Sequence, residues 1–252
     1  MTSIEIGLEN HIGHVVLNRP EALNALLPEM LISLEEAVTN LAADESCRVI
    51  VLRGAGRAFS AGVDLKALAG IEPAHGKVGT VFDDPAACAT KAIRAAQVPV
   101  IAQVHGFCFT GALEIALHCD MIYTTRDTKF GDTHVKWGLR PTWGMSQNLA
   151  RAVGVRRARE LSFTSRTFSG EEAVRWGLAL DAYETPEALH EAVCRHASAI
   201  AAASPGAVAA MKALYRTHES DLGLEPALAA EQVADFPDID DTADRLGTFA
   251  KS

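Results

Sequence analysis

The sequence is poor in aromatic residues, which fill 6% of its 252 positions, and it contains few cysteines. The cysteines are scattered and odd in number, and they are Cys47, Cys88, Cys108, Cys119 and Cys194. Because no two of them are spaced as C-x-x-C, the pattern argues against a disulfide framework and against a zinc site built on paired cysteines. We therefore predict a protein of a reducing compartment, the cytoplasm.

Basic residues are also in deficit, with 23 Lys and Arg against 32 Asp and Glu, a net charge of −9. A nucleic-acid-binding protein usually carries a basic face, and no segment of this chain builds one.

Long apolar runs are missing as well. The best candidate for a membrane span, residues 93–117, is interrupted by polar residues and falls short of the ~18 apolar residues required. The first residues lack a basic and then apolar pattern, so we expect no secretory signal.

Hydrophobic residues make up 48% of the chain, which is enough to bury a sizeable core and excludes disorder. Apolar periodicity predicts a hairpin over residues 4–17 and a helix that begins at Pro28. The predicted segments that follow are a strand at 48–53, a surface loop at 70–82, a helix at 83–96, a strand at 98–104, a helix at 112–118 and a strand at 121–124. Strands that alternate with helices indicate an α/β fold, and the chain reads as mostly helical after about residue 145.

Two common motifs are nearly present in the glycine-rich stretch that follows the 48–53 strand. A dinucleotide fingerprint would need a third glycine where Phe59 stands, and no helical pattern begins there. Ser60 lies in A-F-S-A-G, whereas a nucleophile elbow needs glycine at the position of Ala58. Nicotinamide binding and a serine hydrolase are therefore both disfavoured.

Residues 59–65 and 105–114 form a more informative pair, because each follows a predicted strand and places glycine just before a predicted helix. Free amides at a helix N-terminus are donors for a negatively charged oxygen. Two such amides that converge would form an oxyanion hole, in which one donor is worth ~3–4 kcal/mol of transition-state stabilisation. Glycine after a strand often serves only a turn, and the residues alone leave both interpretations open.

Several motifs occur in one order along the chain. They are N-R-P-E-A-L-N-A-L at 18–26, F-S-A-G-V-D-L at 59–65, H-G and G-A-L-E within 105–114, C-D at 119–120, F-G at 130–131, Gly138, Pro141 and S-P at 204–205. In this respect the sequence resembles the crotonase superfamily, the enoyl-CoA hydratases and isomerases. The resemblance implies a spiral of ββα units over residues 1–190 and a helical C-terminal trimerisation module over 191–252.

The same resemblance implies an acyl-CoA thioester as ligand, with coenzyme A as part of the substrate and no metal or redox cofactor. It implies a homotrimer or a dimer of trimers. The backbone amides of Val63 and Gly111 would hold the thioester carbonyl, and Glu114 would transfer a proton. The residues implied to bind the substrate are Ala22, Leu23, Ala61, Gly62, Val63, Asp64, Leu65, Phe107, Gly111 and Glu114.

Glu114 follows Gly111 by three residues, which places it on the helix face near that amide. Apolar neighbours on both sides predict partial burial, which would raise its pKa towards neutrality. A surface or capping glutamate is the alternative. Asp64 would repel charge that develops in an oxyanion hole, so we predict that it caps a helix at 65–68 instead.

The second glutamate of the hydratases is replaced here by His134, two residues after Asp132. An imidazole titrates near neutrality and could move a proton, with Asp132 orienting it or acting itself. Alternatively, the position has lost its acid and the pair is structural. The leading hypothesis is an enoyl-CoA hydratase; an isomerase of the same fold and a non-catalytic acyl-CoA-binding protein are the alternatives. Trp137 and Trp143 would line the acyl pocket or belong to the core.

Overall fold

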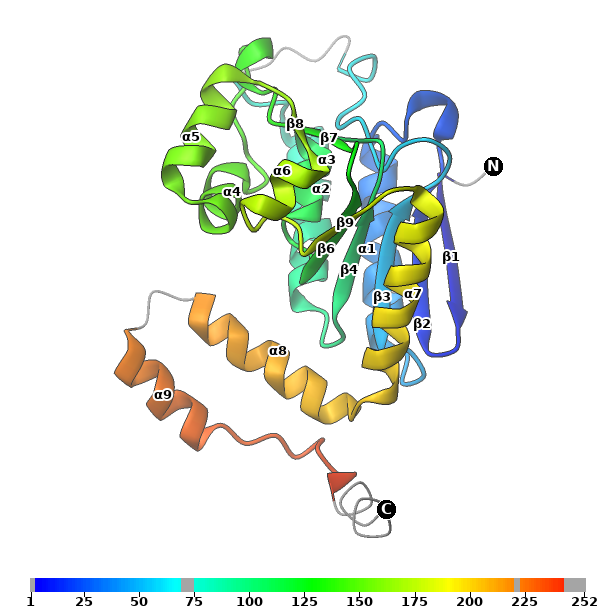
Figure 1. Ribbon diagram of the computed structural model, residues 1–252, viewed down its shortest axis with the longest axis vertical. Coiled ribbons are helices and arrows are strands. Elements are labelled where there is room, and N and C mark those ends of the chain that lie inside the picture. The colour runs from blue at the N-terminus through cyan, green and yellow to red at the C-terminus, as the bar shows by residue number, and fades with distance from the viewer. Residues whose placement is uncertain (1–2, 69–74, 220–222, 243–252) are drawn as a thin grey trace.

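The computed structural model describes residues 3–68, 75–219 and 223–242, and its centre is a six-stranded sheet in the order β1-β2-β3-β4-β6-β9 (Figure 1). The strands are β1 (Ile4–Glu9), β2 (Ile12–Leu17), β3 (Val49–Gly54), β4 (Val100–Val104), β6 (Met121–Thr125) and β9 (Asp181–Tyr183). The hairpin β1–β2 is antiparallel, as predicted, and every other pair in this sheet is parallel. The α/β class is thus confirmed.

A second, three-stranded sheet has the order β5-β7-β8. Its strands are β5 (Phe107–Phe109), β7 (Lys129–Gly131) and β8 (Phe168–Ser169). Because β5 follows β4 after a two-residue turn, this small sheet begins where the large one ends. It presents the segments after β5 and β7 to the same region of the molecule, and the candidate site lies there.

Helices cover both faces of the large sheet. The helices are α1 (Pro28–Ala43), α2 (Thr80–Ala95), α3 (Gly111–Ala116), α4 (Met145–Val153), α5 (Val155–Thr164), α6 (Gly170–Arg175), α7 (Pro186–Ala202), α8 (Pro205–Glu219) and α9 (Leu224–Val233). Short 3-10 turns add η1 (Pro20–Ala22) and η2 (Val135–Trp137). Figure 1 shows α7 in front of the sheet, with α1 and α2 behind it.

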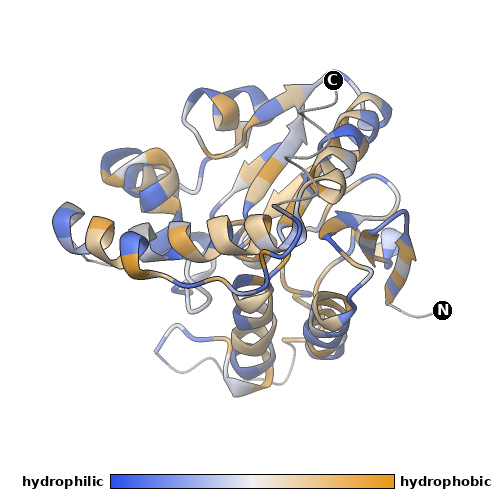
Figure 2. Ribbon diagram, turned by 90° about the horizontal axis from the view of Figure 1, so that it is seen from below, coloured by the Kyte–Doolittle hydropathy of each residue, from blue (hydrophilic) through white to orange (hydrophobic). Residues whose placement is uncertain are grey.

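Strand β3 shows how the sequence determines these layers. Successive strand side chains point to opposite faces, and all four of its β-branched and leucine residues are buried. Ile50 and Leu52 belong to the large core that includes α1 and α2, whereas Val49 and Val51 belong to the smaller core under α7. A strand covered on both faces reads as a continuous apolar run, which is why the short run of β-branched residues predicted strand β3. Figure 2 shows apolar residues along the central strands.

Helix α2 begins at Thr80, three residues earlier than predicted, so the end of the expected 70–82 loop is helical. The reason is tertiary. Phe82 is fully buried and shares one face of the helix with Ala86 and Ala89, a pattern that begins before the predicted start. Residues 70–74 of the expected loop lie outside the described residues.

The C-terminal helices divide into a packed part and a projecting part. Helix α7 lies on the large sheet through Leu189, Val193 and Ala197, so residue 190 falls inside an element of the core. Lys212 fixes α8 to the body: its Nζ donates to Asp120 Oδ2 at 2.7 Å and to the Val98 carbonyl at 2.9 Å. Figure 1 shows α8 and α9 side by side, away from the sheet. The division at 190/191 stays a prediction.

In the part of the chain that the structure describes, no single helix is long and apolar enough to cross a bilayer, although α7 and Pro205–Thr217, bent by 107°, pass that test as a pair. All five cysteines are free thiols.

Candidate active site

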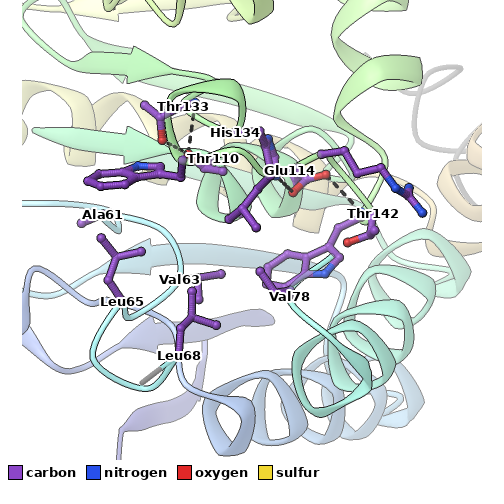
Figure 3. Close-up of a pocket in the computed structure, with 15 residues that line it drawn as sticks. Ala61, Val63, Leu65, Leu68, Val78, Thr110, Glu114, Thr133, His134 and Thr142 are labelled. Carbon is purple, nitrogen blue, oxygen red and sulfur yellow. Dashed lines mark hydrogen bonds and ion pairs between the residues drawn. The ribbon is translucent and has the colours of Figure 1, made fainter. Parts of the chain in front are cut away.

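A cavity of about 80 Å³ opens where the two predicted glycine segments meet (Figure 3). Its apolar wall includes Val63, Leu65, Val78 and Leu139, and both Trp137 and Trp143 line it. Its polar wall consists of Thr110, Glu114, Thr133, His134, Arg140 and Thr142. A space of this size accommodates several water molecules beside groups that can hydrogen-bond them.

The two glycine turns are in direct contact. Gly62 has φ +90°, and a Cβ added to it would lie 2.7 Å from the Phe109 carbonyl and 3.7 Å from Gly111 N. A Cβ on Gly111 would lie 2.6 Å from the ring of Trp143. A side chain on Gly62 would therefore separate these segments, and one on Gly111 would displace Trp143. Glycine serves here to let the two backbones approach each other.

The amides of Val63 and Gly111 have no hydrogen-bond partner within the described residues. Leu26 and Val63 form an isolated parallel bridge, in which Asp64 N and Leu26 N donate and Val63 N takes no part. Gly111 is the first residue of α3, and the first amides of a helix have no partner within it. Both residues line the cavity. Two residues with unpartnered amides therefore line one cavity, and the oxyanion hole stays a prediction.

Glu114 is 1% exposed, which excludes the surface alternative. Its Oε1 accepts hydrogen bonds from the backbone N–H groups of Trp143 and Met145, both at 3.0 Å, so the N-terminal end of α4 fixes the carboxylate. Burial raises the pKa of Glu114 to about 7, although His134 and the two amides act to lower it. A carboxyl group that titrates near neutrality can both accept and donate a proton at working pH.

Asp132 and His134 form a buried pair. The His134 Nδ1 lies 2.7 Å from Asp132 Oδ1, and the His134 backbone N–H donates to the same oxygen at 3.2 Å. Burial acts to raise the pKa of Asp132, but hydrogen bonds from His134 and from Ser162 outweigh it and leave that pKa below its ordinary value. An ionised Asp132 accepts the Nδ1 proton. The free lone pair or second proton of the imidazole is therefore at Nε2.

The imidazole Nε2 in turn lies 3.5 Å from Glu114 Oε2. A continuous line of titratable groups therefore runs from Asp132 through His134 to Glu114, which lies at the cavity. Figure 3 shows His134 beside Glu114. The imidazole and the carboxylate are direct neighbours at the cavity. Whether they transfer protons, or the position has lost its acid, stays a prediction.

The structure brings some of the predicted substrate-binding residues together and leaves others apart. Ala61, Val63, Leu65, Gly111 and Glu114 line the cavity. The residues that lie outside its wall are Ala22, Leu23, Gly62, Asp64 and Phe107. Of these, Leu23 supports the wall, because its carbonyl accepts a hydrogen bond from the Ala61 amide at 2.9 Å. Their roles in binding stay predictions.

The prediction that Asp64 caps a helix is wrong. Residues 65–68 form a turn, and Asp64 Oδ1 accepts the Lys66 amide at 3.0 Å within it. Its other oxygen, Oδ2, pairs with Arg19 at 3.2 Å. Arg19 also donates to the Ala25 carbonyl, so this ion pair ties the segment after β2 to the turn. The carboxylate is thereby held out of the cavity, which removes the repulsion that motivated the prediction.

Ser60 has a structural role. Its hydroxyl donates to the Asn24 carbonyl at 2.8 Å and accepts the Gly62 amide at 3.2 Å, and the residue is fully buried. It is therefore no nucleophile.

Sequence reasoning missed Thr110 and Thr133, whose hydroxyls lie 2.6 Å apart in the cavity wall. Each stands directly beside a residue that was singled out, Gly111 and His134, but no spacing rule links positions 23 residues apart. It also missed Val78, Leu139 and Thr142, which reach the cavity only through the packing of loops.

Comparison with known proteins gives a consistent result. The family Enoyl-CoA hydratase/isomerase matches residues 7–245. A probable peroxisomal enoyl-CoA hydratase of Arabidopsis thaliana is 35% identical over 72% of this chain and 66% of its own, so this chain spans just under two thirds of that protein. A peroxisomal Delta(3,5)-Delta(2,4)-dienoyl-CoA isomerase of the same plant is 32% identical over 84% of this chain and 80% of its own.

Solved structures agree with the fold. The crystal structure of an enoyl-CoA hydratase/carnithine racemase from Magnetospirillum magneticum superposes with a TM-score of 0.90 at 30% identity. The match covers 100% of this chain and 93% of that one.

Proposed function

Because this chain belongs to the enoyl-CoA hydratase/isomerase family, we propose that it is an enzyme that adds water across the double bond of a 2-enoyl-CoA thioester. One observation carries the proposal. Val63 and Gly111, whose amides have no partner among the described residues, line the same small cavity as the buried side chains of Glu114 and His134, which lie 3.5 Å apart. Coenzyme A enters as part of the substrate, and the proposed reaction uses no resident cofactor.

The first requirement of the reaction is stabilisation of negative charge. When water adds to the β-carbon of the enoyl thioester, the electron pair moves to the thioester oxygen and gives an enolate. The Val63 and Gly111 amides donate to that oxygen. Fixed donors in a site that excludes bulk water stabilise such charge strongly, because they need no reorganisation during the reaction.

The second requirement is a balanced movement of protons. The Glu114 carboxylate takes one proton from the attacking water, and the oxygen of that water bonds to the β-carbon. The imidazolium of His134 gives its Nε2 proton to the α-carbon of the enolate. Glu114 is then protonated and His134 is neutral. A proton that passes from Oε2 to Nε2 across their 3.5 Å contact restores the starting state.

Asp132 acts through His134. Its carboxylate holds Nδ1–H and so directs Nε2 towards Glu114 and the substrate. Asp132 is therefore a positioning residue in this proposal, and the histidine takes the place of the second glutamate.

The segment of Ala22 and Leu23 together with Phe107 would contact the coenzyme A part of the substrate, outside the cavity that receives the acyl group. The support for this is the hydrogen bond from the Ala61 amide to the Leu23 carbonyl, which joins that segment to the cavity wall.

An isomerase is the second candidate. Among the residues that the structure describes, Glu114 is the single carboxylate in the cavity wall, and a double-bond shift needs only one group that removes a proton from one carbon and returns it to another. The similarity to a dienoyl-CoA isomerase is in keeping with this reading.

The test mixes the purified protein with crotonyl-CoA and with longer 2-enoyl-CoA esters and follows the enoyl thioester absorbance together with product mass. Loss of absorbance with a mass gain of one water supports the hydratase. To test the isomerase, 3-enoyl-CoA and dienoyl-CoA esters are supplied, and a shifted double bond at unchanged mass supports it. Binding of acyl-CoA by calorimetry with no turnover of any ester would overturn both and leave a binding protein.

The assembly proposed for this chain is a homotrimer or a dimer of trimers. Its support is the projecting C-terminal part, where Met211, Tyr215 and Val233 are exposed apolar side chains. Light scattering coupled to size exclusion measures the mass directly, and a clean monomer would contradict this assembly.

A further inference from the structure

Thr110 holds a backbone conformation that its side chain disfavours. The residue joins β5 to α3 with φ 48° and ψ −110°. These are the angles of the first central position of a type II′ turn, which glycine normally occupies. A β-branched residue with positive φ is an outlier, and such outliers cluster where the surrounding structure enforces them at functional sites.

The Thr110 hydroxyl does not cap the helix that follows it. Thr185, at the start of α7, shows the usual arrangement: its backbone is extended and its hydroxyl accepts the Ala188 amide at 3.2 Å. Thr110 makes no such bond to α3. Its hydroxyl instead pairs with the Thr133 hydroxyl at 2.6 Å and accepts the Thr133 amide at 3.3 Å. Figure 3 shows the two side chains together on the cavity wall.

This hydroxyl pair connects the segment that carries the Gly111 amide to the segment that carries the His134 imidazole. Thr110 directly precedes Gly111, whose amide donates to the thioester oxygen in the proposed reaction. Thr133 stands between Asp132 and His134. The backbone provides a second link nearby, because the Thr110 amide donates to the Gly131 carbonyl at 2.8 Å. That link fixes the strand end, whereas the hydroxyl pair fixes the segment that carries the imidazole.

We propose that the Thr110–Thr133 hydroxyl bond is a positioning element that holds the Gly111 amide in register with the His134 imidazole. The inference rests on the proposed hydration, in which the oxygen and the α-carbon of one thioester must meet the amide and the imidazole at the same time. A displacement of about 1 Å between such groups can reduce the rate roughly a hundredfold.

Thr110→Gly is the informative variant, because it removes the hydroxyl and also relieves the backbone. The expected result is a Tm equal to or above that of the parent protein, with kcat reduced roughly 10- to 100-fold and KM changed by less than about threefold. Thr133→Val is expected to lose a similar factor in kcat. Thr110→Ser retains the hydroxyl and is expected to recover kcat to within about threefold of the parent.

Two matched controls separate this effect from general damage. Thr185→Gly applies the same exchange to a threonine that caps a helix away from the cavity. Thr125→Val breaks a buried threonine pair of similar length, since the Thr125 and Thr128 hydroxyls lie 2.8 Å apart. Both controls are expected to lower Tm and to leave kcat unchanged, which is the opposite of the pattern expected for Thr110→Gly.

The double variant Thr110→Gly with Thr133→Val should lose no more than either single variant, because each already breaks the same bond. If Thr110→Gly and Thr133→Val each keep kcat within twofold of the parent, the proposal is overturned. A second measurement applies even if no 2-enoyl ester is turned over. The NMR chemical shifts of the His134 ring, assigned by their loss in His134→Gln, should change in Thr110→Gly and not in Thr185→Gly, and unchanged shifts in Thr110→Gly would overturn the proposal independently of the hydratase assignment.

Discussion

Helices α3 and α6 are each six residues long, and both start with glycine at the end of a short strand of the same small sheet. Their N-termini nevertheless differ. At α6, the Ser169 hydroxyl accepts the Glu172 amide at 3.1 Å and the Glu172 carboxylate accepts the Ser169 amide at 2.9 Å. This capping box satisfies donors that the helix itself leaves free. At α3, the preceding threonine caps nothing.

The difference separates a structural helix end from one available for binding. The capping box stabilises α6, because the Ser169 and Glu172 amides find their acceptors within the chain. The Gly111 amide, the first of α3, has no partner among the described residues, and the Thr110 side chain is engaged with Thr133 rather than with the helix. The glutamates differ in the same way: Glu172 faces its own helix end, whereas Glu114 is held by amides of the α4 region. An uncapped helix end beside a buried acid is thus the distinguishing feature of the active region.

The largest expected effect comes from Glu114→Gln. The amide oxygen of glutamine can still accept the Trp143 and Met145 N–H groups, so the fold is preserved while the base is lost. We expect kcat to fall roughly 10²- to 10⁴-fold, the usual contribution of a positioned acid or base, with acyl-CoA binding retained in calorimetry. Glu172→Gln, at the capped helix, is the matched control and should keep full activity. Unchanged turnover in Glu114→Gln would remove Glu114 from the mechanism.

Asp132→Asn should have a smaller effect, because the variant leaves His134 in place and changes only which nitrogen carries the proton. We expect kcat to fall about 10- to 100-fold, as for other groups that orient a reactive side chain. Asp120→Asn is the control: Asp120 accepts the Val100 amide, pairs with Lys212 and is not part of the cavity wall. It should lower Tm and leave the pH profile of kcat unchanged. If Asp132→Asn behaves in the same way, His134 needs no orienting partner.

The pH dependence follows from the pKa of Glu114, which burial raises to about 7. The proposed base is the ionised carboxylate, and its fraction decreases as the pH falls through that value. Below it, kcat should decrease about tenfold per pH unit. The profile is measured with crotonyl-CoA between pH 5 and pH 9 on roughly half-unit steps. A profile that stays flat through pH 6 would show that Glu114 does not act as a base in this range.

The smallest effect on activity is expected at the capped helix. Ser169→Ala removes one side of the capping box and should lower the free energy of unfolding by about 1 kcal/mol. Turnover should stay within about twofold of the parent, because α6 donates to no ligand. Denaturant unfolding and the enoyl-CoA assay on the same preparation check both statements. A loss of activity as large as that of Thr110→Gly would remove the distinction between the two helix ends.

Much of the framework could be predicted from periodicity. The hairpin, the helix from Pro28 and the buried strand at β3 follow from apolar spacing within a dozen residues. Glu114 and His134 could be singled out by their positions after Gly111 and Phe130, and the structure places both at one cavity. The error at Asp64 has a different origin. Its partner Arg19 lies 45 residues earlier, and no local pattern predicts an ion pair over that separation.

The sequence by itself therefore determined the α/β layering and the two glycine turns, whereas Glu114 and His134 were singled out through the resemblance to the enoyl-CoA hydratases. The layering and the turns depend on side-chain spacing and on the backbone freedom of glycine, which are local properties. Only the tertiary structure decided which amides stay unpaired and which pKa Glu114 has. Those depend on burial and on donors such as the Met145 amide, 31 residues away, that packing brings to the carboxylate. Position along the chain does not fix such distances, because they follow from how the layers close over the cavity.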